Sequence, residues 1–165
     1  ELDRDVYGPL SMDAHGTALA YTRGDPPALS LVRYDLRAGR AAVMAEALVP
    51  AWCPALSADG SEVVVVASPD GTPSLYRVRE GEAPRPWVLP AGSPLPTGPG
   101  APVVFGDALV FEDEAGLHAL GLDGVARRSL PGVHGPVLSR DGVTLFAQRG
   151  ATLLGLGVRD LEVAR

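Results

Sequence analysis

Residues 56–66 read Leu-Ser-Ala-Asp-Gly-Ser-Glu-Val-Val-Val-Val, and residues 74–78 read Ser-Leu-Tyr-Arg-Val. The first stretch reaches an Asp-Gly pair at Asp59 and Gly60 and then starts a new apolar run. This pattern is typical of a β-hairpin, because glycine adopts the positive φ of a tight turn at little cost. The second stretch alternates apolar and other residues, which predicts a further strand with two differently exposed faces.

The hairpin and the strand after it recur together along the chain. The turn glycines are Gly16, Gly60, Gly106 and Gly142, which are 44, 46 and 36 residues apart. The leucines of the third strands are Leu31, Leu75, Leu117 and Leu153, which are 44, 42 and 36 residues apart. A weaker fourth strand is expected at residues 41–44, 86–89, 126–130 and 161–164. Four strands in about 40 residues predict a propeller blade. A plain β-sandwich or barrel does not explain why the turn glycines and the third-strand leucines recur with the same period.

We therefore predict an all-β chain of four four-stranded, blade-like repeats. Residues 1–165 form a single β-propeller domain or a propeller fragment, with repeats at about 7–46, 50–90, 100–131 and 133–165. Three assemblies stay open: a compact four-bladed ring, part of a larger ring, and a half-ring that forms a homodimer. The third repeat lacks the Asp-Gly turn, so we expect its blade to be shortened.

Composition and charge exclude several classes of protein. The 165 residues are 46% hydrophobic and include 20 Gly and 16 Pro, which favours many short strands joined by turns. Fourteen basic residues face 20 acidic ones, for a net charge of −6 without a basic stripe, so nucleic acid is not expected as a partner. No apolar stretch has transmembrane length, and the single Cys53 forms no disulfide within the chain.

The aligned repeats resemble those of TolB-type (WD40-like) β-propellers. The family motif runs roughly Trp-Ser-Pro-Asp-Gly-x-x-Ile-Ala-Phe, followed by a strand Leu-Tyr-x-x-Asp-Leu. The second repeat is closest, although Leu56 stands where tryptophan is usual, and residues 138–142 of the fourth repeat also match. This resemblance implies a bacterial, periplasmic or extracellular protein that binds another protein. A cytoplasmic location stays open as the alternative. The same repeats also occur in the propeller domains of peptidases.

The residues match none of the usual catalytic templates, so we expect no catalytic residue, no cofactor and no metal. Sequences such as Gly-x-Ser-x-Gly and His-Glu-x-x-His are absent, and His15, His118 and His134 lie in three different repeats. We interpret His118 as a partly buried structural residue. The acidic run 112–114 is interpreted as a solvated turn, and a cation site there is the less favoured alternative.

Trp52 and His134 are the candidate binding residues. Each lies four residues before the leucine of its Leu-Ser-x-Asp-Gly stretch, on a predicted loop near the mouth of the propeller channel. The alternative is a structural role, in which each ring packs over its own blade. We predict a non-enzymatic scaffold that recognises another protein. Two alternatives stay open: an accessory propeller of a larger hydrolase, and a sugar or small-molecule binder.

Overall fold

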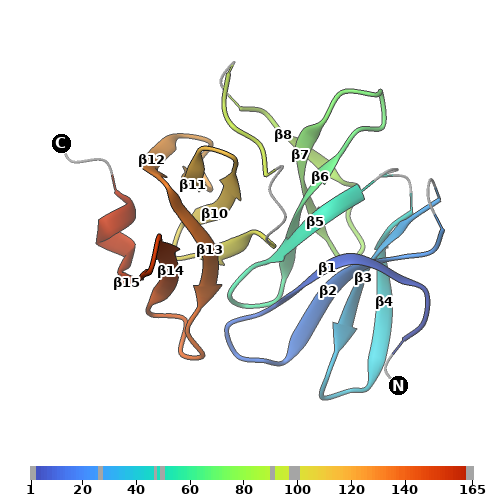
Figure 1. The fold of residues 1–165 in the computed structure, drawn as a ribbon. Helices are drawn as coiled ribbons and strands as arrows, with labels where there is room; N and C mark the ends of the chain where they lie inside the picture. Colours follow the sequence, from blue (N-terminus) through green and yellow to red (C-terminus); the bar gives the residue numbers. More distant parts are fainter. Residues whose placement is uncertain are drawn as a thin grey trace. The chain divides into compact units, whose positions relative to one another are not determined.

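The computed structural model describes residues 3–25, 28–46, 48, 51–89, 92–96 and 101–162, except for the side chains of residues 51 and 52. These residues form fifteen strands and one 3-10 helix, so the chain is all-β, as predicted (Figure 1). The chain divides into two compact units, Glu1–Trp87 and Val88–Arg165. In the described part, no helix is long and apolar enough to cross a bilayer.

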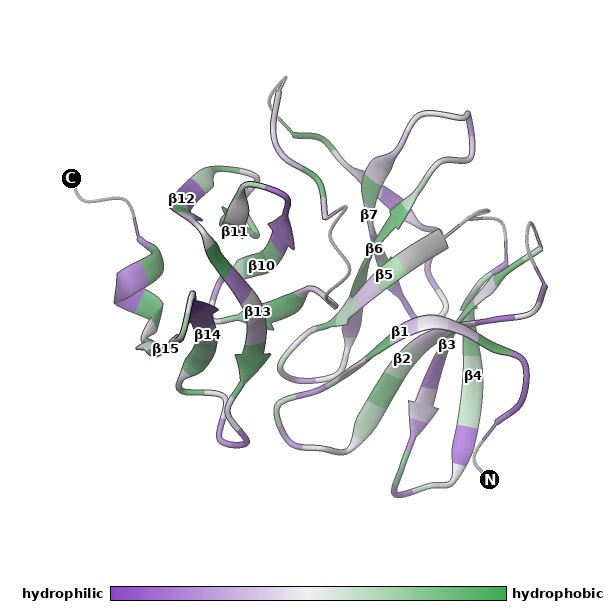
Figure 2. Cartoon of the chain, viewed as in Figure 1, coloured by the Kyte–Doolittle hydropathy of each residue, from purple (hydrophilic) through white to green (hydrophobic). Residues whose placement is uncertain are grey.

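The first unit contains two four-stranded antiparallel sheets. Sheet 1 has the order β1-β2-β3-β4 and consists of β1 (Val6–Met12), β2 (Ala18–Arg23), β3 (Ser30–Asp35) and β4 (Arg40–Ala45). Sheet 2 has the order β5-β6-β7-β8 and consists of β5 (Ala51–Leu56), β6 (Glu62–Ala67), β7 (Ser74–Arg79) and β8 (Arg85–Trp87). Every described residue of β6 is buried, which its run of valines predicts (Figure 2).

The second unit contains one four-stranded and one three-stranded sheet. Sheet 3 has the order β12-β11-β10-β9 and consists of β9 (Val103–Phe105), β10 (Ala108–Asp113), β11 (Gly116–Gly121) and β12 (Ala126–Pro131). Sheet 4 has the order β13-β14-β15 and consists of β13 (Val133–Leu138), β14 (Leu145–Arg149) and β15 (Thr152–Leu156). The expected shortening of the third blade is confined to β9, which has three residues.

The fourth repeat departs from the predicted four strands. Where a strand was expected at 161–164, the chain forms a 3-10 helix, Val158–Leu161, and residues 163–165 lie outside the described part. The Asp160 carboxylate accepts the backbone N–H of Gly157 at 2.7 Å, which closes the turn locally. Leu161 is buried in the core between sheets 3 and 4. The helix therefore uses its leucine for packing rather than adding a strand.

The four predicted turn glycines all adopt positive φ. The values are +65° for Gly16, +72° for Gly60, +61° for Gly106 and +71° for Gly142. In the second and fourth repeats the Ser-x-Asp-Gly sequence is a hydrogen-bonded turn. Ser57 Oγ donates to Asp59 Oδ1 at 2.6 Å and accepts the amide of Glu62 at 3.0 Å. Ser139 and Asp141 repeat this arrangement at 2.6 Å, so the motif has a structural role.

Neighbouring sheets within each unit share a core. In the first unit, buried residues of β2 and β3 pack against those of β6 and β7. In the second unit, buried residues of β10 and β11 pack against those of β14, with Leu154 and Leu156 of β15 at the margin. Each sheet thus has one face against its neighbour, which is the packing of propeller blades.

Candidate functional site

Three of the four sheets contain a β-bulge at the same place in the first strand. The register shifts after Tyr7 in β1, after Trp52 in β5 and after His134 in β13. These residues pair with Thr22, Val66 and Gln148 on the second strand. On the other side of each bulge, pairing resumes two positions earlier on that strand, at Ala20, Val64 and Phe146. A bulge reorients the side chains beside it, so the three residues occupy one structurally equivalent position.

The sequence after each of these residues explains the bulge. The next residue has positive φ: +75° at Gly8, +53° at Cys53 and +64° at Gly135. A proline follows in all three cases, at Pro9, Pro54 and Pro136. Proline lacks an N–H, and the unpaired residue of a bulge is a place where a strand tolerates that loss. Cys53 is the unusual member, because positive φ is strained for a residue with a Cβ.

Trp52 and His134 do not lie on loops, as the sequence suggested, but inside strands. Each strand contains a bulge at the Cys-Pro or Gly-Pro pair, and strand pairing continues on both sides of it. The His134 side chain is 48% exposed, and the equivalent Tyr7 is also 48% exposed. The side chain of Trp52 lies outside the described part of the chain. The placement of these residues around a channel stays a prediction.

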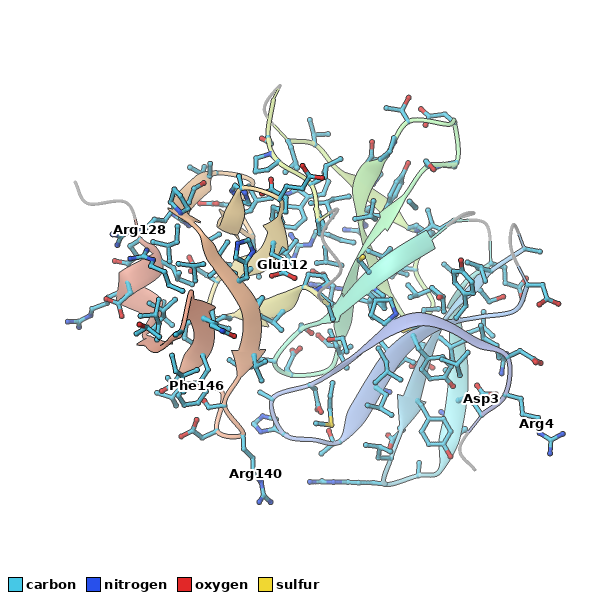
Figure 3. All side chains as sticks on the ribbon, in the orientation of Figure 1. Asp3, Arg4, Glu112, Arg128, Arg140 and Phe146 are labelled. Atoms are coloured by element: carbon cyan, nitrogen blue, oxygen red, sulfur yellow. The ribbon has the colours of Figure 1, made fainter. Side chains whose placement is uncertain are left out.

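A buried carboxylate holds the bulge of sheet 4. Glu112 extends from β10 beside β13 (Figure 3), and its Oε2 accepts the backbone N–H of Gly135 at 2.7 Å. The same oxygen lies 3.8 Å from Nδ1 of His134. The interaction fixes the backbone beside His134 and leaves the ring half-exposed.

Glu112 was misinterpreted from the sequence as part of a solvated acidic turn. It lies within β10, and its side chain is 8% exposed. Glu112 lies two residues after Val110 and therefore on the same face of the strand. Its place on the face of an apolar residue is the sequence signal that predicts its burial. Its partner, the Gly135 amide, is 23 residues away in sequence, so the local pattern gives no sign of the contact.

His118 is a structural residue, in keeping with its interpretation from the sequence. Its Nδ1 lies 2.9 Å from Ser129 Oγ on β12, and its ring stacks on Phe111 of β10 with the centroids 5.6 Å apart. Its Nε2 lies 2.9 Å from Asp113 Oδ1, and this contact with the His118 ring lowers the pKa of the Asp113 carboxyl. His118 and Ser129 are directly paired across β11 and β12, so cross-strand pairing accounts for the contact between their side chains.

A second polar cluster lies on sheet 2. Glu62, Arg77, Arg79, Glu82 and Arg85 line a depression of about 150 Å³. Both oxygens of Glu62 are engaged, by Arg77 Nε at 2.6 Å and by Arg79 Nε at 2.8 Å. The Arg77 guanidinium also lies 5.9 Å from the ring centre of Trp87. The depression is smaller than typical ligand pockets of roughly 300–1,000 Å³, so we interpret the cluster as a structural ion-pair network.

The structure gives no support for a metal centre. Among the residues it describes, no group of three or more His, Cys, Asp or Glu side chains is placed to hold an ion. The thiol of Cys53 is buried, and burial raises its pKa. A raised pKa lowers the reactive thiolate fraction, so we expect Cys53 to react slowly with thiol reagents in the folded chain.

Comparisons with known proteins agree with this fold. Neither a protein-family model nor a curated protein matches the sequence. Among solved structures, TolB from Acinetobacter baumannii has a TM-score of 0.59 at 16% identity, over 97% of this chain and 43% of that chain. A gluconolactonase from Xanthomonas campestris has a TM-score of 0.62 at 19% identity, over 90% of this chain and 55% of that chain.

A prolyl endopeptidase is also similar, with a TM-score of 0.57 at 18% identity, over 97% of this chain but only 26% of that chain. The chain therefore spans less than two thirds of each of these proteins. At identities this low, the similarities show the fold alone. They confirm the resemblance to TolB-type β-propellers at the level of the fold.

Proposed function

We propose that this chain is a non-enzymatic scaffold that recognises another protein through the side chains at its first-strand bulges. The observation that carries the proposal is the equivalence of Tyr7 and His134. Two sheets present a ring at the same register position, and both rings are half-exposed. Amphipathic rings with few rotatable bonds are favoured in protein interfaces. By its pairing, Trp52 occupies the same position in a third sheet.

The backbone beneath two of these rings is fixed by hydrogen bonds. The Thr22 hydroxyl donates to the carbonyl oxygen of Tyr7 in sheet 1. The Gly135 amide donates to Glu112 in sheet 4. A side chain held on rigid backbone loses less conformational entropy when a partner binds, which favours affinity.

Site-specific photo-crosslinking in the source cells tests the proposal. A photoreactive amino acid is placed at Tyr7 or His134 and, as a control, at Val125, which is 54% exposed but not at a bulge. We expect the same partner protein to be crosslinked from Tyr7 and His134 and not from Val125. Equal crosslinking from all three positions, or none from the two bulges, would contradict the proposal.

Alanine substitution separates recognition from folding. We expect Trp52→Ala and His134→Ala to weaken binding of the crosslinked partner at least tenfold without lowering the melting temperature. If Trp52→Ala lowers the melting temperature and leaves binding intact, the Trp52 ring packs on its own blade instead. The two positions are judged separately by this measurement.

The likeness to a prolyl endopeptidase supports a second candidate, an accessory propeller of a larger hydrolase. In that case the reactive serine lies outside residues 1–165. A fluorophosphonate probe applied to the natural full-length protein would then label a serine beyond this segment. Absence of labelling under conditions that label a known serine hydrolase would favour the scaffold.

The likeness to TolB also supports a location outside the cytoplasm. We propose a periplasmic or extracellular site for this chain. A fusion of alkaline phosphatase to the natural protein tests it, because that enzyme is active only where its disulfides form. An inactive fusion that accumulates at normal levels would overturn the assignment.

A further inference from the structure

The fourth sheet has one strand fewer than the other three. Sheets 1, 2 and 3 each contain four strands, whereas sheet 4 ends at β15. Leu153 of β15 is the equivalent of Leu31, Leu75 and Leu117, because each of these leucines lies on the third strand of its sheet. The other third strands pair on their outer side with a fourth strand, which is β4, β8 or β12. Among the described residues, β15 has the position of an inner strand but no outer neighbour.

The register identifies the backbone groups at the unpaired edge of β15. Arg149 and Thr152 close the β14–β15 hairpin across a two-residue turn, so they form a hydrogen-bonded pair. Along an antiparallel ladder, such pairs alternate with pairs whose N–H and C=O groups point outward. Leu153 and Gly155 belong to the second kind, and their backbone groups therefore point away from β14. A row of this kind is a template for another strand.

The sequence of β15 lacks the features that protect an edge strand. Edge strands commonly avoid further pairing through charged side chains, prolines, bulges or short length. The outer strand β4 has a bulge and begins at Arg40, and β12 has a bulge and ends at Pro131. The outer strand β8 has three residues and contains Pro86. In contrast, β15 reads Thr-Leu-Leu-Gly-Leu and pairs with β14 without a register shift, which is typical of an inner strand.

No other strand in the described part of the chain is left to fill this position. All fifteen strands already have a place in one of the four sheets. The segment after β15 forms the 3-10 helix Val158–Leu161 and directs Leu161 into the core of the second unit. An added strand therefore comes from outside the described residues.

The three complete sheets indicate which side chain an added strand carries. In each of them, the fourth-strand residue opposite the third-strand leucine is apolar: Ala45, Trp87 and Leu130. Ala45 belongs to the core of the first unit, and Leu130 packs against the core of the second. By equivalence, the strand beside β15 has an apolar residue opposite Leu153.

We propose that β15 binds an extended segment of a partner protein, which adds to sheet 4 as its fourth strand and places an apolar side chain opposite Leu153. In strand addition, backbone hydrogen bonds provide affinity and alternate side chains provide specificity. Here the bonds go to Leu153 and Gly155. β15 lies at the opposite edge of sheet 4 from β13, which carries His134. The site is therefore separate from the first-strand bulges, and the proposal does not rest on the proposed recognition function.

Amide hydrogen exchange, measured by NMR on the full chain, tests the site. The probe is a synthetic peptide with the sequence of residues 40–46, which contains the fourth strand of sheet 1. We expect the Leu153 and Gly155 amides to exchange rapidly in the chain alone and at least about tenfold more slowly at millimolar peptide. His134→Ala should bind this peptide as wild type does, so failure of this proposal and failure of the proposed function are distinguishable.

Two controls remove the backbone pairing alone. The same peptide with every amide nitrogen methylated keeps its side chains but donates no hydrogen bond, so it should leave the exchange unchanged. Gly155→Pro removes an outward N–H from β15, which an edge strand tolerates, and should weaken peptide binding at least about tenfold. The methylated peptide leaves the protein itself unaltered, so the test stands even if Gly155→Pro does not fold.

Each other outcome overturns the proposal. Exchange that the unmethylated peptide does not slow shows that β15 accepts no further strand. Equal slowing by the methylated peptide shows that the peptide adsorbs through its side chains. Slow exchange in the chain alone shows that the edge is already paired, by a second copy if protection increases with protein concentration and by this chain if it does not.

Discussion

The ion-pair network on sheet 2 allows a quantitative test of what burial adds to a salt bridge. We consider Glu62→Gln, which preserves the shape of the side chain and removes its charge. The Glu62 side chain is 9% exposed, and each carboxylate oxygen accepts one arginine Nε–H, from Arg77 at 2.6 Å and Arg79 at 2.8 Å. Charge-assisted hydrogen bonds contribute about 1.5–3 kcal/mol and neutral ones about 0.5–1.5 kcal/mol. In the glutamine variant the amide oxygen accepts one arginine N–H as a neutral bond, which costs about 1 kcal/mol. The amide NH2 accepts nothing, so the second charge-assisted bond is lost. That loss costs about 1.5 kcal/mol, the low end of the range, because Arg79 is 51% exposed and its N–H can bond to water.

We expect Glu62→Gln to lower the free energy of unfolding by about 2.5 kcal/mol. For a chain of this size, each kcal/mol shifts the melting temperature by about 2–4 °C, so the transition should fall by about 5–10 °C. Denaturant unfolding followed by circular dichroism gives the free energy, and a thermal scan gives the shift. Most of the difference should persist in 1 M salt, because buried charge pairs are screened less than exposed ones.

Glu82→Gln is the matched control. Glu82 meets Arg85 at the same 2.8 Å that separates Glu62 from Arg79, but the two side chains are 41% and 74% exposed. An exposed pair contributes little, so this substitution should cost less than about 0.5 kcal/mol. A cost of no more than about 0.5 kcal/mol for Glu62→Gln, or an equal cost for the control, would contradict a stabilising contribution from the buried carboxylate.

Two further predictions concern the bulge and the turns. Gly135→Ala should cost about 1 kcal/mol, because φ is +64° and an added Cβ meets nothing within 4 Å, so the backbone alone is strained; an unchanged urea midpoint would contradict this. The hydroxyl of Ser57, with donors from Ser61, lowers the pKa of Asp59 to about 2. Because that pKa is below the unfolded value of 3.8, the ionised form stabilises the fold above about pH 4, and this contribution is lost as the pH falls towards 2. The advantage of wild type over Asp59→Asn, which we expect to stay below about 1 kcal/mol at this exposed site, should therefore disappear between pH 4 and 2; an advantage independent of pH would refute the assignment.

Local signals predicted the turns and most of the strands. Positive φ at Gly60 and Gly142 is encoded by the turn residues themselves, and the third strands begin close to the leucines that marked them. The end of the chain was predicted less well, because Leu161 reads equally as part of a strand or as the buried residue of a short helix. Only the core it enters distinguishes the two.

The candidate site was less visible in the sequence. The equivalence of Trp52 and His134 followed from spacing, but the bulge did not, because a proline in an extended segment is compatible with an edge strand, a strand start or a bulge. Tyr7 was missed because the bulge of β1 spans one more residue than the others, which shifts its spacing. The pairing register of β1 with β2 identifies Tyr7 as the equivalent of Trp52 and His134.

Local residue patterns were sufficient to predict the all-β class, the period of the repeats and the positions of the hairpin turns. These features depend on φ preferences and on side-chain alternation among residues adjacent in the chain. The burial of Glu112, the contact of Glu62 with two arginines, and the exposure of Phe146 and Leu153 became visible only in the folded chain. Burial and charge pairing are set by residues far away in sequence, so equivalent positions in similar repeats end in different environments.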